Sequence, residues 1–243
     1  MKVFLAATQS RLYLVKKYRP PYVLETFYTI NDESMEEYKK CKMFLLDSGA
    51  FTFMSGTKEA VDWDRYVEKY AEFINKHGIQ YFFELDIDVL VGLKEVERLR
   101  HKLETLTGRK CIPVWHKSRG IEYWKQMCNE YDFVAIGGIV TREIKQKEYK
   151  NFKPLIAIAR KHNCKVHGLG FTATSLLKEY KFYSIDSTSW LKASRFGRID
   201  YFDGQKMKTY PKPKNSRTID YRKCDEFIFP EWVKFQKYAE RCL

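Results

Sequence analysis

The sequence predicts one (β/α)8 barrel of the TIM type over residues 1–243, with a basic insertion at 191–223. Short apolar runs alternate with amphipathic stretches, which is typical of parallel strands buried on both faces and separated by helices. The length of 243 residues fits such a barrel, which takes roughly 250 residues. An open, doubly wound sheet is the alternative. No G-x-G-x-x-G opens a helix after a strand, which weakens a dinucleotide-binding function.

The predicted strands are short and rich in Val, Ile, Phe and Tyr. Seven of them are residues 2–7, 43–47, 80–86, 111–115, 133–137, 165–169 and 182–186. An eighth strand is predicted at Phe227–Phe229, directly before the last helix. With helices between them, these strands predict a closed parallel barrel.

Apolar residues at helical spacing predict the intervening helices. They cover residues 61–77, 94–106, 120–130, 154–162, 175–180 and 230–242. Pro154 and Pro230 fit the first turn of a helix, and Thr174 fits an N-cap.

The insertion at 191–223 is both basic and aromatic. Its Asp203-Gly204 pair predicts a hairpin between residues 198–202 and 205–210. Basic side chains interleaved with tyrosines suit phosphate contacts and base stacking. The residues predicted to bind nucleic acid are Lys192, Arg195, Arg198, Lys206 and Lys208. A solvated loop with structural aromatic residues is the alternative.

The whole chain is strongly basic, with 44 Lys and Arg against 31 Asp and Glu and a formal charge of +13. This favours a polyanionic partner, most simply nucleic acid, although a basic enzyme without such a partner stays open. Aromatic residues make up 16% of the chain, which excludes disorder over most of it. No apolar run approaches the roughly 18 residues of a membrane-spanning helix.

The N-terminus and the cysteines bear on localisation and metal content. MKVFLAATQS is predicted to be a first strand rather than a signal peptide. The six scattered cysteines fit reduced thiols in the cytoplasm. No Cys/His spacing fits zinc, so neither a metal nor a cofactor is expected.

Acidic residues, a histidine and glycines follow the predicted strands, where the active site of a parallel barrel lies. These strand ends carry Asp47-Ser48, Glu84, Asp86, Asp88, Trp115-His116, Gly137-Gly138, Gly168, Gly170 and Asp186. Asp and Glu are poor strand formers and are costly to bury. A shared active site is the simplest reason for acids at three strand ends, and acids that cap the following helices are the structural alternative.

Several carboxylates around one pocket suit a reaction that passes through an oxocarbenium-like sugar. One carboxylate can attack the anomeric carbon and hold a covalent intermediate, while another moves protons at the leaving and entering groups. A site for Mg²⁺ or Mn²⁺ built from the Asp and His residues is the rival interpretation.

Four segments resemble tRNA-guanine transglycosylases, and they occur in the same order. LLDSGAF at 45–51 resembles the family's D-S-G-G-F segment, and AIGGI at 135–139 resembles its Gly-Gly substrate-binding loop. HGLGFTATSLLKEYKFYSIDSTS at 167–189 resembles the stretch from M-G-V-G to F-D-C-V, and FGRIDYFDGQKMKTY at 196–210 resembles the hairpin after the nucleophile. The resemblance implies a (β/α)8 barrel.

The resemblance also implies an activity, which is exchange of guanine in a nucleic acid for a 7-deazaguanine base. Asp186 would be the nucleophile that attacks C1′, and Asp47 would be the general acid/base at the glycosidic bond. Asp86 would recognise the amino and ring N–H groups of the purine. The other residues implied in substrate binding are Ser48, Gly137, Gly138, Gly168, Gly170 and His116, which stands where the family has a glutamine.

The chain departs from the family's pattern in the parts that shape the surface for the nucleic acid. The chain lacks the C-x-C-x-x-C zinc motif, has Ala50 in place of a glycine, and has Ser187-Thr188-Ser189-Trp190 instead of P-T-R. It is also much shorter. It therefore resembles more closely the short, zinc-free phage and bacterial members thought to insert 7-deazaguanines such as preQ0 into DNA. DNA is expected rather than tRNA, and the need for an accessory protein that gives access to DNA stays open.

Other functions remain open from the sequence. They are exchange on tRNA, transfer or hydrolysis of free nucleosides, metal-assisted hydrolysis by the Asp/His set, and nucleic-acid binding without catalysis. Trp115 and Trp190 stand beside site residues and are candidates for stacking on a flipped base.

Overall fold

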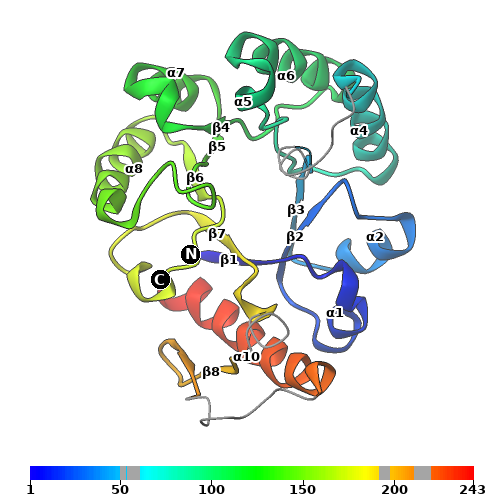
Figure 1. The fold of residues 1–243 in the computed structure, drawn as a ribbon, viewed down its shortest axis with the longest axis vertical. Helices are drawn as coiled ribbons and strands as arrows, with labels where there is room; N and C mark the ends of the chain where they lie inside the picture. Colours follow the sequence, from blue (N-terminus) through cyan, green and yellow to red (C-terminus); the bar gives the residue numbers. More distant parts are fainter. Residues whose placement is uncertain (50–52, 54–60, 192–197, 211–219) are drawn as a thin grey trace.

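The computed structural model describes residues 1–49, 53, 61–191, 198–210 and 220–243. Its main sheet is parallel, in the order β3-β2-β1-β7-β6-β5-β4. The strands are β1 (Lys2–Ala6), β2 (Tyr22–Thr26), β3 (Met43–Asp47), β4 (Val114–Trp115), β5 (Phe133–Ile136), β6 (Lys165–Gly168) and β7 (Ser184–Ser187). In Figure 1 they curl into a ring that the helices surround.

The segment at 82–83 closes the ring between the edge strands β3 and β4. Leu46 of β3 forms a parallel bridge with Phe82, and Phe83 forms one with Ile112, just before β4. The amide of Phe83 donates to the carbonyl of Leu46 at 2.9 Å, and the amide of Ile112 donates to that of Phe82 at 2.8 Å. Eight parallel positions therefore close a (β/α)8 barrel, which confirms the predicted fold class.

Two strands differ from the sequence prediction. β2, a short run directly after Pro20-Pro21, is absent from that prediction. Phe227–Phe229, predicted as the eighth strand, instead lies within α10 (Tyr221–Cys242) and is a correction. Phe227 is exposed while Ile228 and Phe229 are buried, because one face of this amphipathic helix packs against the barrel.

The helices between the strands are short and amphipathic. They are α1 (Leu12–Tyr18), α2 (Asp32–Tyr38), α4 (Trp63–His77), α5 (Asp88–Val91), α6 (Leu93–Thr107), α7 (Gly120–Glu130) and α8 (Phe152–Lys161). The helices predicted at 61–77, 94–106, 120–130 and 154–162 are confirmed to within two residues at each end. None of the helices that the structure describes is long and apolar enough to cross a membrane.

The last two predicted helices are corrected. Residues 175–180 do not form an α-helix. The segment after β6 has a 3-10 turn at Thr174–Leu176 instead. The final helix starts at Tyr221 rather than Pro230, since the side chain of Asp220 caps it by accepting a hydrogen bond from the amide of Lys223 at 3.0 Å.

The predicted hairpin is confirmed as β8 (Asp200–Phe202) paired antiparallel with β9 (Met207–Thr209). It packs on α10, where the amide of Phe202 donates to Glu231 at 2.9 Å and the Phe202 ring contacts Tyr238. In Figure 1 the hairpin lies on the outer side of α10.

The core has two layers, one on each side of the barrel wall. Inside the barrel, residues from alternate positions of the strands pack together, among them Phe4, Tyr22, Leu45, Phe83 and Phe133. A second and larger cluster lies between the strands and the helices. Side chains at strand ends therefore point either into the barrel mouth or into the helix layer, according to the alternation.

Candidate active site at the barrel mouth

Asp47 ends β3 and points into the barrel, because Met43 and Leu45 of the same strand belong to the interior cluster. Its Oδ2 accepts a hydrogen bond from the amide of Gly49 at 3.0 Å. Burial, together with the negative charges of Asp86 and Asp186, raises the pKa of Asp47 to about 6. The charges of Asp86 and Asp186 therefore act on Asp47 at one end of the barrel, and Asp47 can exchange a proton near neutral pH.

Asp186 lies in β7 and is almost completely buried. Its Oδ1 accepts hydrogen bonds from the amide of Gly170 at 2.5 Å and from His167 Nε2 at 3.2 Å. Gly170 has a φ of +70°, so this sharp turn after β6 favours glycine. Oδ2 of Asp186 makes no hydrogen bond to any residue within the described ranges. Two hydrogen bonds thus hold Oδ1 in place.

His167 was not singled out by the sequence reasoning, although it belongs to the site. It is fully buried inside the barrel, and its Nδ1 lies 2.8 Å from Ser184 Oγ. The signal that could have found it is the alternation along β6, which places His167 on the interior face next to β7.

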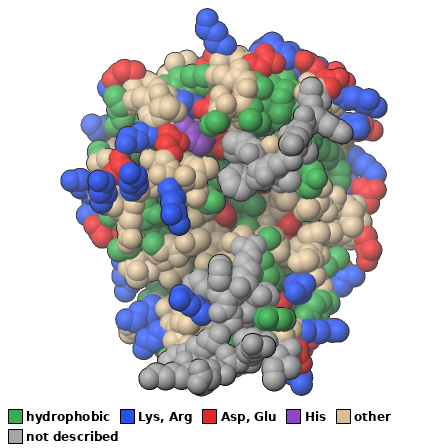
Figure 2. Space-filling model, in the orientation of Figure 1, with side chains coloured by type: hydrophobic (Ala, Val, Ile, Leu, Met, Phe, Trp, Pro, Cys, Tyr) green, Lys and Arg blue, Asp and Glu red, His purple; other side chains and the backbone are tan. Residues whose placement is uncertain are grey.

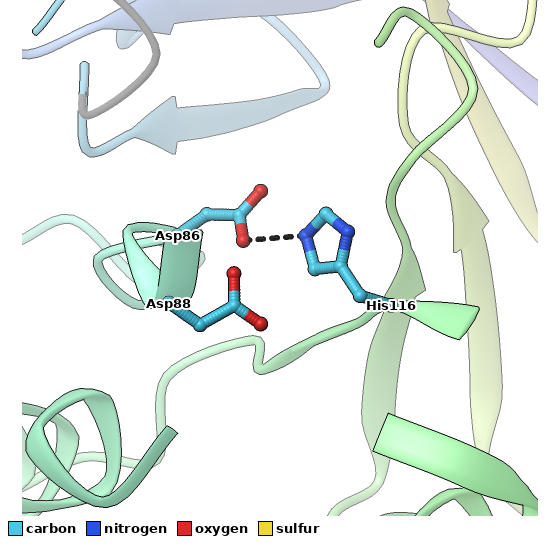
Figure 3. A group of neighbouring side chains, drawn as sticks. All are labelled: Asp86, Asp88 and His116. Carbon is cyan, nitrogen blue, oxygen red and sulfur yellow. Dashed lines mark hydrogen bonds and ion pairs between the residues drawn. The ribbon is translucent and has the colours of Figure 1, made fainter. Parts of the chain in front are cut away.

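His116 follows β4 and lies between two carboxylates. Its Nε2 is 2.7 Å from Asp86 Oδ1, and its Nδ1 is 2.8 Å from Glu143 Oε2. Figure 3 draws the interaction with Asp86 as a dashed line. Burial lowers the pKa of His116, but the hydrogen bonds and charges of these carboxylates outweigh it and raise the pKa to about 9. His116 is therefore an imidazolium at neutral pH with both N–H groups engaged.

Glu143 is a second residue that the sequence reasoning missed, on the loop after β5. Besides His116, it accepts a hydrogen bond from the amide of Ser118 at 3.0 Å. Gly137 makes room for this arrangement, since a Cβ there would lie 2.9 Å from His116 Nε2. Gly138 is buried beside it, and its carbonyl accepts from the amide of Ile144 at 3.0 Å. The two glycines therefore shape the His116–Glu143 pair.

Glu84 follows the strand segment at 82–83, but its side chain does not belong to the barrel mouth. It is fully buried and accepts hydrogen bonds from Arg100, Arg119 and the amide of Val114 at 2.8–3.0 Å. The nearby Asp88 also binds Arg119, at 3.1 Å. Glu84 is thus a scaffold residue that fastens helices to the barrel wall.

Asp86, Asp88 and His116 are the residues that could hold a metal ion. One ligand atom from each lies within 4.8 Å of the others, and Figure 3 shows the three side chains converging. Their charges already have partners, however, because Asp88 binds Arg119 and His116 binds Asp86. A cation would have to displace the proton on His116 Nε2 and compete with Arg119.

Two residues predicted to bind substrate face away from the mouth. Ser48 is fully buried, and its carbonyl accepts a hydrogen bond at 2.6 Å from Tyr66 of α4, in the helix layer. Gly168 packs against Phe171 and Ile185, which belong to the outer cluster, so it does not line the floor of the mouth. The outward orientation of both residues follows from the strand alternation, which turns every second residue away from the barrel interior.

The two tryptophans considered for base stacking are structural. Trp190 is fully buried, and its Nε1 donates to the carbonyl of Ala6 at 2.8 Å. The Nε1 of Trp115 donates to the carbonyl of Gly120 at 2.8 Å, and its ring packs against Trp124. Neither ring face is open to a flipped base.

The structure describes only some of the basic residues predicted to bind nucleic acid. Lys192 and Arg195 lie outside the described residues. Arg198, Lys206 and Lys208 are exposed, and Lys208 forms an ion pair with Asp203 at 2.8 Å. The hairpin lies beyond α10 and away from the centre of the ring (Figure 1). Figure 2 shows Lys and Arg side chains around the edge of this face with Asp and Glu side chains among them, and a few acidic side chains nearer the centre.

No model of a known protein family matches the sequence, and no curated protein matches it. Solved structures do match the fold. One is a protein from Coccidioides immitis assigned as a fructose-1,6-biphosphate aldolase, with 9% identity and a TM-score of 0.53 over 99% of this chain and 87% of that one.

Two further structures extend the comparison. The carboxyl transferase domain of Rhizobium etli pyruvate carboxylase is 12% identical, with a TM-score of 0.50 over 98% of this chain and 48% of that one. A GH113 β-1,4-mannanase is 10% identical, with a TM-score of 0.45 over 100% of this chain and 85% of that one. At such identities the likeness to the aldolase and the transferase shows the fold alone. The chain has a TIM-type barrel, which enzymes of several classes share.

Proposed function

We propose that the protein is a transglycosylase that replaces guanine in a nucleic acid, DNA rather than tRNA, with a 7-deazaguanine base. The observation that carries the proposal is that Asp47 at the end of β3 and Asp186 in β7 both lie on the interior face of the barrel, where the negative charges of Asp86 and Asp186 add to burial in raising the pKa of Asp47. Three carboxylates from distant parts of the chain suit proton transfer, base recognition and nucleophilic attack. The resemblance to tRNA-guanine transglycosylases in four segments supports the same distribution of roles.

The first half of the reaction expels guanine. The target nucleotide leaves the stack and enters the mouth, because C1′ is otherwise inaccessible. Asp186 Oδ2 forms a bond to C1′ while the C1′–N9 bond breaks and its electron pair stays on N9. The guanine N9 takes a proton from Asp47, whose raised pKa leaves a usable fraction of acid near neutral pH.

The second half reverses these bonds with a new base. The 7-deazaguanine enters the vacated pocket, gives its N9 proton to Asp47 and attacks C1′, which frees the Asp186 carboxylate. Asp86 recognises the purine edge with the oxygen that does not contact His116. Because both N–H groups of His116 are engaged by carboxylates, His116 orients Asp86 rather than binding the base itself.

The charge of the chain supports a polymeric substrate. A formal charge of +13 favours a substrate with many phosphates over a free nucleoside, because basic side chains neutralise phosphates along a strand. Labelled guanine supplied with duplex DNA, single-stranded DNA, tRNA or free guanosine is expected to enter DNA. Label in tRNA or in the nucleoside instead would reassign the substrate.

The central test replaces the nucleophile. Asp186→Asn is expected to abolish both guanine exchange and any covalent adduct between the protein and the sugar, since the amide cannot attack C1′. Asp132→Asn, at an exposed carboxyl outside the mouth, is the matched control and should exchange normally. Exchange by the Asp186 variant at the control's rate would refute the proposal.

Metal-assisted hydrolysis is the second candidate, because Asp86, Asp88 and His116 present three ligand atoms to one point. The two functions differ in their response to chelation. Guanine exchange is expected to persist after EDTA treatment, whereas an activity that EDTA removes and Mn²⁺ restores would favour the metal site.

A further inference from the structure

We infer that His167 is a positioning residue that, together with Gly170, holds Oδ1 of Asp186 so that Oδ2 is the oxygen that attacks C1′. Ser184 in turn holds the His167 ring. The inference rests on the proposed function, since it takes Asp186 as the nucleophile.

The contacts form one chain across β6 and β7. Ser184 Oγ lies 2.8 Å from His167 Nδ1, and His167 Nε2 lies 3.2 Å from Asp186 Oδ1. The amide of Gly170 reaches the same Oδ1 at 2.5 Å. The β6–β7 register, which pairs His167 with Ser184, sets this alignment in the backbone.

The direction of the hydrogen bonds follows from the groups themselves. The Asp186 carboxylate can only accept, so His167 Nε2 carries the hydrogen of that bond. The Ser184 hydroxyl can then donate to Nδ1, which fixes the ring by both of its nitrogens. A histidine held this way has one tautomer and one orientation.

The surroundings of His167 exclude direct contact with substrate. The side chain is fully buried, and the rings of Phe4, Phe83 and Phe133 surround it at centroid distances of 6.0, 5.4 and 6.4 Å. It therefore acts through Asp186 alone. A polar ring in this aromatic layer is costly unless it is hydrogen-bonded, so its presence needs a reason that packing does not supply.

The consequence for the reaction is a choice between two oxygens. Oδ1 already accepts two hydrogen bonds, whereas Oδ2 has no partner among the residues that the structure describes. When Oδ2 bonds to C1′ and the N9–C1′ pair leaves with guanine, Oδ1 becomes the ester carbonyl and keeps both donors. The carboxylate need not rotate during either half of the exchange, which is the benefit of a preorganised group.

The test separates position from folding by comparing two substitutions. His167→Gln keeps an N–H donor at a similar reach, while His167→Met fills the space without a donor. In single turnover, His167→Met is expected to slow formation of the sugar–protein adduct by about 10- to 100-fold, as a misplaced reacting group does. The dissociation constant for free guanine should stay within about twofold of wild type, since uniform binding is not lost.

The conservative variant His167→Gln distinguishes a loss of positioning from a loss of folding. His167→Gln is expected to retain most of the adduct rate. Equal losses of rate in both variants, matched by equal losses of thermal stability, would assign His167 a scaffold role and overturn the inference. Adduct formation by His167→Met at the wild-type rate would overturn it as well.

A milder change covers the case in which His167→Met fails to fold. Ser184→Ala removes one hydroxyl and is expected to slow adduct formation by about threefold to tenfold, because the His167 ring loses one of its two hydrogen bonds. A wild-type rate for Ser184→Ala would then overturn the inference. Activity in Asp186→Asn defeats the proposed function itself, whereas an inactive Asp186→Asn beside a fully active His167→Met defeats only the role of His167.

Discussion

The acidic residues near the strand ends differ in environment because they differ in partners. Asp47 and Asp86 lie in the mouth with few hydrogen bonds, and the mutual repulsion of the carboxylates raises the pKa of Asp47, after the larger effect of burial. Glu84 is as deeply buried as any residue of the core, but two arginines neutralise it. The electrostatic environment of a buried carboxylate thus depends on the charges next to it.

The first prediction concerns the stability that His116 contributes. Its pKa is about 9 in the folded protein and near 6.5 when unfolded, so the contribution is complete below about pH 6.5 and is lost as the pH rises through about 9. The shift corresponds to about 3 kcal/mol. Between about pH 6 and pH 10, the free energy of unfolding of wild type should fall by about that much more than that of His116→Gln.

Urea titrations at the two pH values measure this difference. His101→Gln, at an exposed histidine on α6, is the matched control and should follow wild type. If the His116 variant and wild type lose stability in parallel, the ion pairs with Asp86 and Glu143 contribute nothing to the fold.

At the scale of elements, α10 completes the barrel although it lies at the far end of the chain. Gln236 of α10 donates from Nε2 to the carbonyls of both Val3 and Tyr22, each at 2.7 Å. The helix therefore fastens β1 to β2, at the start of the strands that lead to the mouth. The N-terminal amino group also donates to Ala239 of the same helix, at 3.0 Å.

The second prediction is that Gln236→Ala destabilises the barrel by about 2–4 kcal/mol, because it leaves a cavity and removes a donor from two buried carbonyls. Chemical denaturation measures the loss. Lys237→Ala, at the next and exposed position, is the control and should cost less than about 0.5 kcal/mol. A loss no larger than the control's would mean that apolar packing alone holds α10.

At the scale of the whole molecule, basic residues outnumber acidic ones. Lys and Arg side chains lie over the outer surface, including the exposed side of the β8–β9 hairpin, and Asp and Glu side chains lie among them. Several of these surface acids are paired with lysine or arginine, as Asp64 is with Arg98 and Lys102. A positive net charge of this size attracts polyanions at low salt concentration.

The third prediction is a steep salt dependence of binding to single-stranded oligonucleotides. The logarithm of the association constant should fall linearly with the logarithm of salt concentration, with a slope of roughly −0.7 per neutralised phosphate. Lys206→Ala should make the slope shallower by about one phosphate contact, whereas Lys161→Ala on α8 should leave it unchanged. A flat salt dependence in wild type would argue against a polymeric substrate.

The sequence by itself determined the β/α alternation, the hairpin, and the placement of Asp47, Asp86, His116 and Asp186 in or just after the last residues of strand segments, because these depend on local patterning and chain order. It failed at β2 and at Phe227–Phe229, where a short apolar run fits a strand and a helix equally well.

Only the tertiary structure decided which polar groups work together. Asp186 meets His167 across 19 residues of sequence, Glu84 meets Arg119 across 35, and Gln236 meets Val3 across 233. The alternation of each strand sets which side a residue faces, and barrel closure sets which residue it meets there. Partner and burial together fix the charge and the role of a side chain, and both arise only when distant segments pack.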